Sequence, residues 1–241
     1  MMGVKRQQVG CLAPTRQKFL KIQPHSCAQI RQRDLALRAF YPIEVTQIGE
    51  KKMTTVEIST PYSSHQVPEG KLTSLGLYVT AREAYEMWKD DPERIKVLDV
   101  RTFEEYVLIG HAEMAANVPL AFPTYNWDAN KGNYSVVGNT NFIAHVQERF
   151  KPDDTILVMC RSGGRSAMAV NALSKAGFAK VHNIIDGFEG DKVEDPESVY
   201  HGKRTRNGWK NSVPWTYQLD PNLVWLPSEG ELDTLRDTLD L

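Results

Sequence analysis

The chain has 241 residues, of which 41% are hydrophobic and 24% charged, as is typical of a globular protein in water. Its apolar runs fall well short of the roughly 18 to 20 residues that a membrane-spanning helix needs. Three cysteines exclude a disulfide framework, and without CxxC or Cys/His spacing we expect no metal and no cofactor. A reducing compartment suits this cysteine usage, so we expect a cytoplasmic protein, and the short apolar runs argue against a membrane partner.

Charge is distributed unevenly along the chain. Residues 1–52 contain ten of the 29 Lys and Arg residues but only three of the 30 acidic residues, so this arm carries +7 and the remainder −8. An acidic main body argues against nucleic acid as a partner.

The basic arm, residues 1–52, has three interpretations. A secretory signal is disfavoured because no apolar stretch follows the basic start. An organelle transit segment fits the arginine content, although Ser and Thr are few. We favour a start-site error, because Met53 begins MTTVEIST and the preceding 49–52 resemble a translated ribosome-binding site. In each case we expect a disordered arm whose Cys11 and Cys27 have no chemical role.

From residue 72 onward, predicted helices and strands alternate. Thr80 and Glu83 form a capping-box signature that opens a helix ending near Lys89. Further helices are predicted at 102–107, 141–150 and 167–175, and strands at 95–100, 115–119, 155–159 and 181–185. This alternation predicts an α/β fold, a doubly wound parallel sheet with helices on both faces.

The remaining segments give weaker signals. Residues 121–140, rich in Asn, Gly, Tyr and Pro, are predicted to form a long loop. Trp209 and Trp215 are expected to fix the C-terminal segment to the domain by burying apolar area. The acidic tail after Pro227 is expected to be a short helix or a frayed end.

A cysteine stands where a predicted strand ends and a helix begins. Residues 160–166 read CRSGGRS, directly after the apolar run that ends at residue 159. N–H groups at a helix N-terminus lack intrahelical partners and lie at the positive end of the helix dipole, so they bind anions. Together with Arg161 and Arg165, they should favour the nucleophilic thiolate of Cys160.

Two glycines in this loop, Gly163 and Gly164, allow successive N–H groups to turn inward as an anion-binding nest. The alternative is that Cys160 merely fills space in the core, as free cysteines often do. We favour the functional interpretation, because a space-filling residue does not require a Gly- and Arg-rich turn.

Other polar residues receive structural interpretations. Asp99 and Arg101 could brace the cysteine loop through charge-assisted hydrogen bonds, although support of the fold is favoured. Ser166 is expected to cap the following helix or to hydrogen-bond the sulfur. His111 is expected to cap a turn, and Glu104 and Glu105 to form a solvated helix face.

Three segments, in this order, resemble the rhodanese (thiosulfate sulfurtransferase) family. They read LDVRTFEEYVLIGHAEMAANVP at 98–119, ILVMCRSGGRSAMAVNALSKAGF at 156–178 and VHNIIDGFEG at 181–190. GWKNSVPW at 208–215 is similar to the C-terminal part of many single-domain members. The resemblance implies a rhodanese-like domain over 72–218, followed by an acidic tail at 219–241.

The resemblance also implies a ping-pong reaction. The Cys160 thiolate would attack the outer sulfur of thiosulfate, release sulfite and carry the sulfur as a persulfide to cyanide, a small thiol or a sulfur-relay protein. Thiosulfate is a dianion, so cationic groups and amide donors suit it. The implied site comprises catalytic Cys160, supporting Asp99 and Arg101, and a substrate-binding loop of Arg161, Ser162, Gly163, Gly164, Arg165 and Ser166.

The insertion at 121–140 is longer than in the shortest family members. It is therefore expected to cover or narrow the pocket, where Trp127 and Tyr134 could shape substrate choice or simply pack.

Two rival functions stay open. A cysteine phosphatase or arsenate reductase needs five residues between its Cys and Arg, whereas only four separate Cys160 from Arg165. The other rival is a sulfur carrier or regulatory rhodanese module without turnover of its own, against which the retained Cys160 argues only in part.

Overall fold

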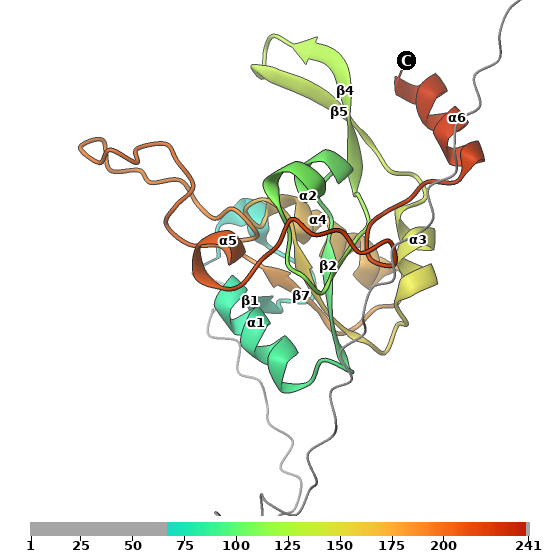
Figure 1. Ribbon diagram of the computed structural model, residues 1–241, viewed down its shortest axis with the longest axis horizontal. Helices are drawn as coiled ribbons and strands as arrows, with labels where there is room; N and C mark the ends of the chain where they lie inside the picture. Colours follow the sequence, from blue (N-terminus) through green and yellow to red (C-terminus); the bar gives the residue numbers. More distant parts are fainter. Residues whose placement is uncertain (1–66, 240–241) are drawn as a thin grey trace, which may run out of the picture. The chain divides into compact units, whose positions relative to one another are not determined.

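The computed structural model describes residues 67–239 and contains a five-stranded parallel sheet (Figure 1). The described residues do not include the basic arm at 1–52, so the predictions made for it lie outside them. The strand order is β1–β7–β6–β2–β3, in which every neighbouring pair is parallel. The strands are β1 (Tyr78–Val79), β2 (Ile95–Asp99), β3 (Ala115–Asn117), β6 (Thr155–Met159) and β7 (Val181–Ile184).

The four predicted strands are therefore confirmed, and β1 is added at one edge. The central strand β6 is buried on both faces, which explains why residues 156–159 form an unbroken apolar run. Successive side chains of β6 point to opposite faces of the sheet. Val158 belongs to one hydrophobic cluster, and Leu157 and Met159 belong to another.

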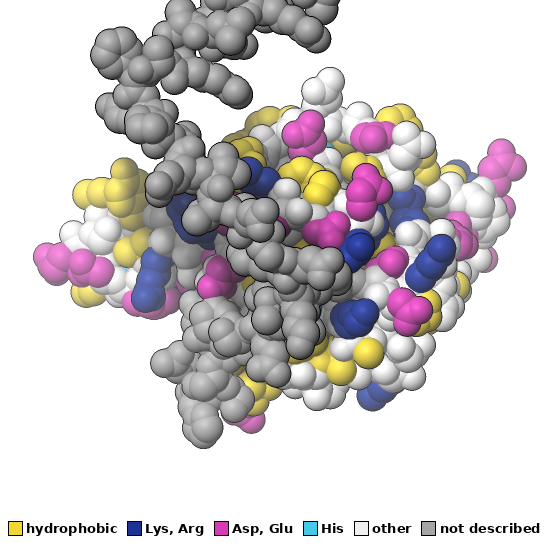
Figure 2. Space-filling model, turned by 90° about the horizontal axis from the view of Figure 1, so that it is seen from below, with side chains coloured by type: hydrophobic (Ala, Val, Ile, Leu, Met, Phe, Trp, Pro, Cys, Tyr) yellow, Lys and Arg dark blue, Asp and Glu magenta, His cyan; other side chains and the backbone are white. Residues whose placement is uncertain are grey.

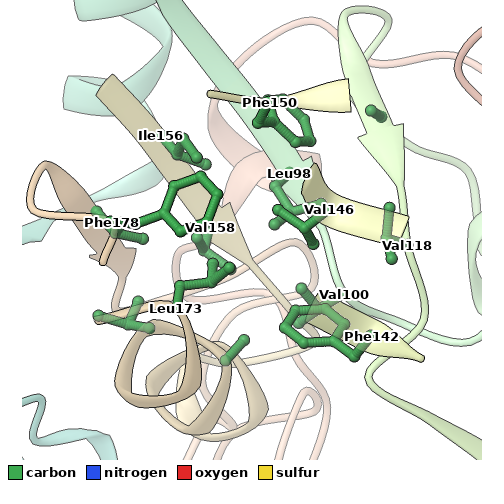
Figure 3. Close-up of a cluster of buried hydrophobic side chains, with 14 of the residues drawn as sticks. Leu98, Val100, Val118, Phe142, Val146, Phe150, Ile156, Val158, Leu173 and Phe178 are labelled. Atoms are coloured by element: carbon green, nitrogen blue, oxygen red, sulfur yellow. The ribbon is translucent and has the colours of Figure 1, made fainter. Parts of the chain in front are cut away.

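Helices α3 (Phe142–Arg149) and α4 (Gly164–Lys175) cover one face of the sheet. Figure 3 shows this cluster, in which Leu98 and Val158 from the sheet meet helix residues such as Val146 and Leu173. At roughly 25 cal/mol per Å² of apolar area removed from water, such a cluster is the main force that holds α4 against β6. The cysteine loop between them is thereby anchored at both ends.

Helices α1 (Ala81–Asp90) and α5 (Trp209–Ser212) cover the other face, with α2 (Phe103–Ile109) contributing Ile109. Trp209 is fully buried there, makes an edge contact with Tyr85 and donates its indole N–H to the carbonyl of Pro214. Trp215 packs by its edge against Phe188. The prediction that these two tryptophans fix the C-terminal segment is confirmed.

Capping boxes open both α1 and α2. In α1, Thr80 Oγ1 accepts from the Glu83 N–H, and the Glu83 carboxylate accepts from the Thr80 N–H. Thr102 and Glu105 form the same reciprocal pair at α2. Each box satisfies two backbone donors that would otherwise lack partners.

The predicted loop at 121–140 is wrong. These residues form an antiparallel hairpin of β4 (Ala121–Asp128) and β5 (Asn133–Gly138), which pairs Trp127 with Tyr134. The turn is closed by a hydrogen bond from the Gly132 N–H to the Asp128 carbonyl, with Gly132 in the left-handed region at φ 62°.

The hairpin starts at the carboxyl edge of the sheet, where the Leu120 N–H donates to the Val100 carbonyl. Figure 1 shows it extending beyond the sheet. On its inner side Phe122 packs against Trp225, whereas Trp127 and Tyr134 are exposed. Cross-strand aromatic pairs and burial of one face stabilise strands here, although Pro, Gly and Asn obscure the alternating pattern in the sequence.

Two further elements complete the described chain. The 3-10 helix η2 (Glu69–Lys71) lies beside the N-terminus of α4, where the Gly70 carbonyl is close to Gly164. The acidic tail contains the helix α6 (Glu229–Leu239), whose Glu231 contacts His145 of α3.

The face seen in Figure 2 carries interspersed basic and acidic side chains. Among residues 67–239, no helix has both the length and the apolar composition needed to cross a membrane.

Candidate active site

The cysteine loop connects the last residue of β6 to the first turn of α4. Cys160 directly follows β6, and α4 begins at Gly164, three residues before the helix start predicted from the sequence. Gly163 is the N-cap residue of α4 and has φ 94°, a conformation that favours glycine. A Cβ at Gly163 would lie 2.2 Å from the Ile185 carbonyl oxygen, so only glycine fits this turn.

The sulfur of Cys160 lies inside this turn with 1% of the residue exposed. The Gly163 N–H donates to Sγ over 3.2 Å, and Ser166 Oγ lies 3.4 Å from Sγ. N–H groups in the first turn of α4 have no intrahelical acceptor and point toward the preceding loop. One amide of the predicted nest, the Gly163 N–H, thus donates to the sulfur and can stabilise a negative charge there. The rest of the predicted nest stays a prediction.

The two loop arginines have different environments. Arg161 is exposed, and within residues 67–239 it has no ion-pair partner. The Arg165 guanidinium instead donates to both carboxylate oxygens of Glu105, each over 2.6 Å. The two arginines of the predicted substrate-binding loop are therefore not equivalent. The role of each in binding substrate stays a prediction.

The expectation that Glu105 belongs to a solvated helix face is wrong. Its side chain is 22% exposed and is shared between the Thr102 capping box and Arg165. Burial alone would raise the pKa of Glu105, but hydrogen bonds and the charge of Arg165 outweigh burial and lower it. In the same way, burial would lower the pKa of Arg165, and Glu105 raises it instead. The capping-box signature at 102–105 could have revealed the contact of Glu105 with Thr102, but not its pairing with Arg165.

Asp99 and Arg101 form a fully buried ion pair behind the loop. Arg101 Nε lies 3.0 Å from both Asp99 oxygens, and Nη2 donates to Asp99 over 2.6 Å and to the Gly110 carbonyl over 2.8 Å. The guanidinium also stacks over the ring of Phe188 at 4.1 Å. Neither residue hydrogen-bonds the cysteine loop among these contacts. Arg101 contacts Phe188, whose N–H donates to the Cys160 carbonyl, and the charge of Asp99 helps to raise the pKa of Arg165.

Residues 187–190, which follow β7, pack against the backbone of the cysteine loop. The Phe188 N–H donates to the Cys160 carbonyl over 2.8 Å, and the Glu189 N–H to the Arg161 carbonyl over 2.9 Å. Gly187 has φ 61°, and a Cβ there would lie 2.5 Å from the Cys160 carbonyl oxygen. This close backbone contact requires glycine and fixes the loop to the end of β7.

The sequence analysis missed one residue of the site, Asn183 of β7. Its side chain is fully buried and accepts a hydrogen bond from Ser166 Oγ over 2.6 Å. An Asn inside an otherwise apolar strand was the available signal, since a buried polar side chain needs partners. His111 stacks on Tyr106 and contacts two backbone carbonyls, in agreement with a structural role.

Comparisons with known proteins identify the family of the chain. A family model described as the rhodanese-like domain matches residues 80–194. Thiosulfate sulfurtransferase 16, a chloroplastic protein of Arabidopsis thaliana, is 40% identical over 93 residues, which are 39% of this chain and 70% of that protein. An uncharacterized protein of Rickettsia prowazekii is 30% identical over 122 residues, which are 50% of this chain and 82% of that protein.

Among solved structures, Rv0390 from M. tuberculosis is 28% identical with a TM-score of 0.46, covering 58% of this chain and 96% of that one. The chain's own fold and loop define an α/β domain with a cysteine at the carboxyl end of a parallel strand. The chain belongs to the rhodanese-like family, and relatives in it bear the name thiosulfate sulfurtransferase.

Proposed function

We propose that the protein is a sulfurtransferase that carries a sulfane sulfur as a persulfide on Cys160. The observation that supports this most strongly is the position of the Cys160 sulfur. It accepts the Gly163 N–H at the N-terminus of α4, within a match to the rhodanese-like family. A sulfur atom held by amide donors can alternate between thiolate and persulfide without rearrangement of the loop.

In the first half-reaction, the Cys160 thiolate attacks the outer sulfur of thiosulfate. A new S–S bond forms to Cys160, and the S–S bond of thiosulfate breaks. Sulfite leaves with the electron pair of the broken bond. The N-terminal amides of α4 then face the terminal sulfur of the persulfide, which carries the negative charge.

In the second half-reaction, a thiophilic acceptor attacks the terminal sulfur. With cyanide, a C–S bond forms, thiocyanate departs, and the electron pair of the S–S bond returns to Cys160 as thiolate. A small thiol or a sulfur-relay protein would react in the same way and become the persulfide.

Arg161 is the residue we assign to attraction of the anionic donor. It directly follows Cys160 in the chain, is exposed, and in the described part of the chain no carboxylate neutralises it. Arg165 contributes through its connection to Glu105, which holds the first turn of α4 in place.

The test is incubation of the full chain with thiosulfate, followed by intact-mass and peptide analysis. We expect a gain of one sulfur atom on the peptide that contains Cys160, and release of thiocyanate when cyanide is added. Cys160→Ser should abolish both signals while the circular dichroism spectrum stays unchanged.

Two other results would redirect the assignment. Hydrolysis of an aryl phosphate without any sulfur gain would indicate a phosphatase. Loading of Cys160 by a cysteine desulfurase but not by thiosulfate would indicate a sulfur carrier.

A further inference from the structure

Asn183 has a side-chain orientation that its own hydrogen bonds determine. Its Nδ2 group donates to the carbonyl oxygens of Lys71 and Gly163, each over 3.1 Å. Turning the amide over would place Oδ1 against both carbonyl oxygens, where it would be repelled. Oδ1 therefore faces Ser166 and acts as an acceptor.

Ser166 lies between two acceptors but has one hydroxyl hydrogen. Its Oγ is 2.6 Å from Asn183 Oδ1 and 3.4 Å from Cys160 Sγ. Ser166 and Asn183 are fully buried, so bulk water does not reach them. An amide oxygen at the shorter distance is the stronger acceptor, and sulfur is a weak one. The hydrogen of Ser166 thus points toward Asn183, and an oxygen lone pair faces the sulfur.

We propose that Asn183 is a positioning residue that holds the Ser166 hydroxyl as an acceptor for the Cys160 thiol. In the resting protein the S–H group donates to Ser166, and Ser166 donates to Asn183. Ser166 can donate a hydrogen bond to the thiolate only if its hydrogen bond to Asn183 breaks. Asn183 therefore competes with the sulfur for this hydrogen and limits formation of the nucleophile.

The consequence for turnover rests on the proposed sulfur transfer, whereas the hydrogen-bond chain can be measured on the thiol alone. Substituting Asn183 removes no charged side chain, although the Lys71 and Gly163 carbonyls lose a hydrogen bond, a loss that the double variant shares. The surrounding charged side chains are Lys71 at the end of η2, Asp99 and Arg101 at the carboxyl end of β2, Glu105 of α2, Arg161 and Arg165 around the loop, and Asp186 after β7.

The experiment measures how fast iodoacetamide alkylates Cys160 as a function of pH, by mass spectrometry of the Cys160 peptide from the full chain. Four proteins are compared: the unaltered chain, Ser166→Ala, Asn183→Ala and the double variant. Asn183→Ala should raise the rate at pH 7 by about three- to tenfold and move the profile to lower pH, because Ser166 is then free to donate to the thiolate.

Ser166→Ala by itself should change the rate at pH 7 less than about threefold, since its hydrogen is engaged elsewhere. In the double variant the gain from Asn183→Ala should disappear, because the hydroxyl that produces it is absent. A residue with a merely structural role would not show this dependence on Ser166.

Two outcomes would overturn the proposal. One is a slowing of about tenfold in Ser166→Ala alone, which would mean that the hydroxyl already donates to the thiolate. The other is an equal effect of Asn183→Ala with and without Ser166. If Asn183→Ala does not fold, the comparison of Ser166→Ala with the unaltered chain decides by itself. If the unaltered chain transfers no sulfur but the four alkylation profiles are as expected, the proposed function is contradicted and this inference still holds.

Discussion

Arg165 at the N-terminus of α4 and Glu105 at the N-terminus of α2 form a bidentate ion pair, with two hydrogen bonds of 2.6 Å. Glu105 also closes the capping box of α2 with Thr102. One carboxylate thus fixes the first turns of two helices that flank the cysteine loop. It also neutralises one of the two loop arginines, whereas Arg161 has no ion-pair partner among residues 67–239.

The first prediction separates the two arginines. Arg161→Ala should raise KM for thiosulfate by roughly three- to tenfold, because an exposed cation that attracts a dianion is lost, and should leave the melting temperature unchanged. Steady-state kinetics at low and high salt measure this, since screening should shrink the difference. Lys180→Ala is the matched control and should have no effect, because Lys180 directly precedes the amino end of β7, whereas Arg161 lies beyond the carboxyl end of β6. Equal effects of both variants would contradict a specific role for Arg161.

The second prediction concerns pH. Because the pKa of Glu105 is lowered in the folded protein, its contribution to stability is present above the unfolded value of about 4.5 and is lost as pH falls through the lower folded value. Glu105→Gln should therefore reduce the free energy of unfolding by about 1 kcal/mol at pH 7, discounted for partial exposure. The difference should shrink as the pH falls below 4.5 through the lowered pKa of Glu105, as measured by urea unfolding across a pH series. A difference that is constant with pH would show that packing, not charge, is responsible.

The third prediction tests the backbone contact between Gly187 and Cys160. Gly187→Ala should destabilise the protein by roughly 2 to 4 kcal/mol and loosen the cysteine loop, because a Cβ would meet backbone atoms at 2.5 Å and 2.7 Å. Gly177→Ala is the control, since Gly177 also has positive φ but a Cβ added there would meet no atom within 4 Å. The control should cost about 1 kcal/mol from backbone strain alone. Similar losses in thermal unfolding would argue against the close contact.

The fourth prediction compares two tryptophans. Trp209→Ala should cost about 3 to 5 kcal/mol, because it empties the cluster between α1 and the sheet. Trp127→Ala removes a side chain that is 58% exposed on the hairpin, and should cost less than about 1 kcal/mol. Chemical denaturation of both variants checks the difference. A large loss for Trp127→Ala would mean that the hairpin supports the core.

Local features of the site were predictable because their signals lie within a few residues. The apolar run before Cys160, the Gly163 turn and the N-terminus of α4 follow one another in the chain, and the hydrogen bond from the Gly163 N–H to the sulfur results from that order. The capping signature at 80–83 correctly identifies a helix start. The same signature at 102–105 accounts for the capping contact of Glu105 but not for its pairing with Arg165, which no local pattern indicates.

By itself the sequence determined the parallel α/β sheet, the helix starts with capping signals and the cysteine loop, since these depend on periodicity and on neighbours in the chain. Only the tertiary structure decided the partners of that loop. Glu105 and Arg165 are 60 residues apart, and Ser166 and Asn183 meet because β6 and β7 pair in one particular register. The hairpin at 121–138 likewise depends on cross-strand pairing and on burial against Trp225, neither of which leaves a local pattern.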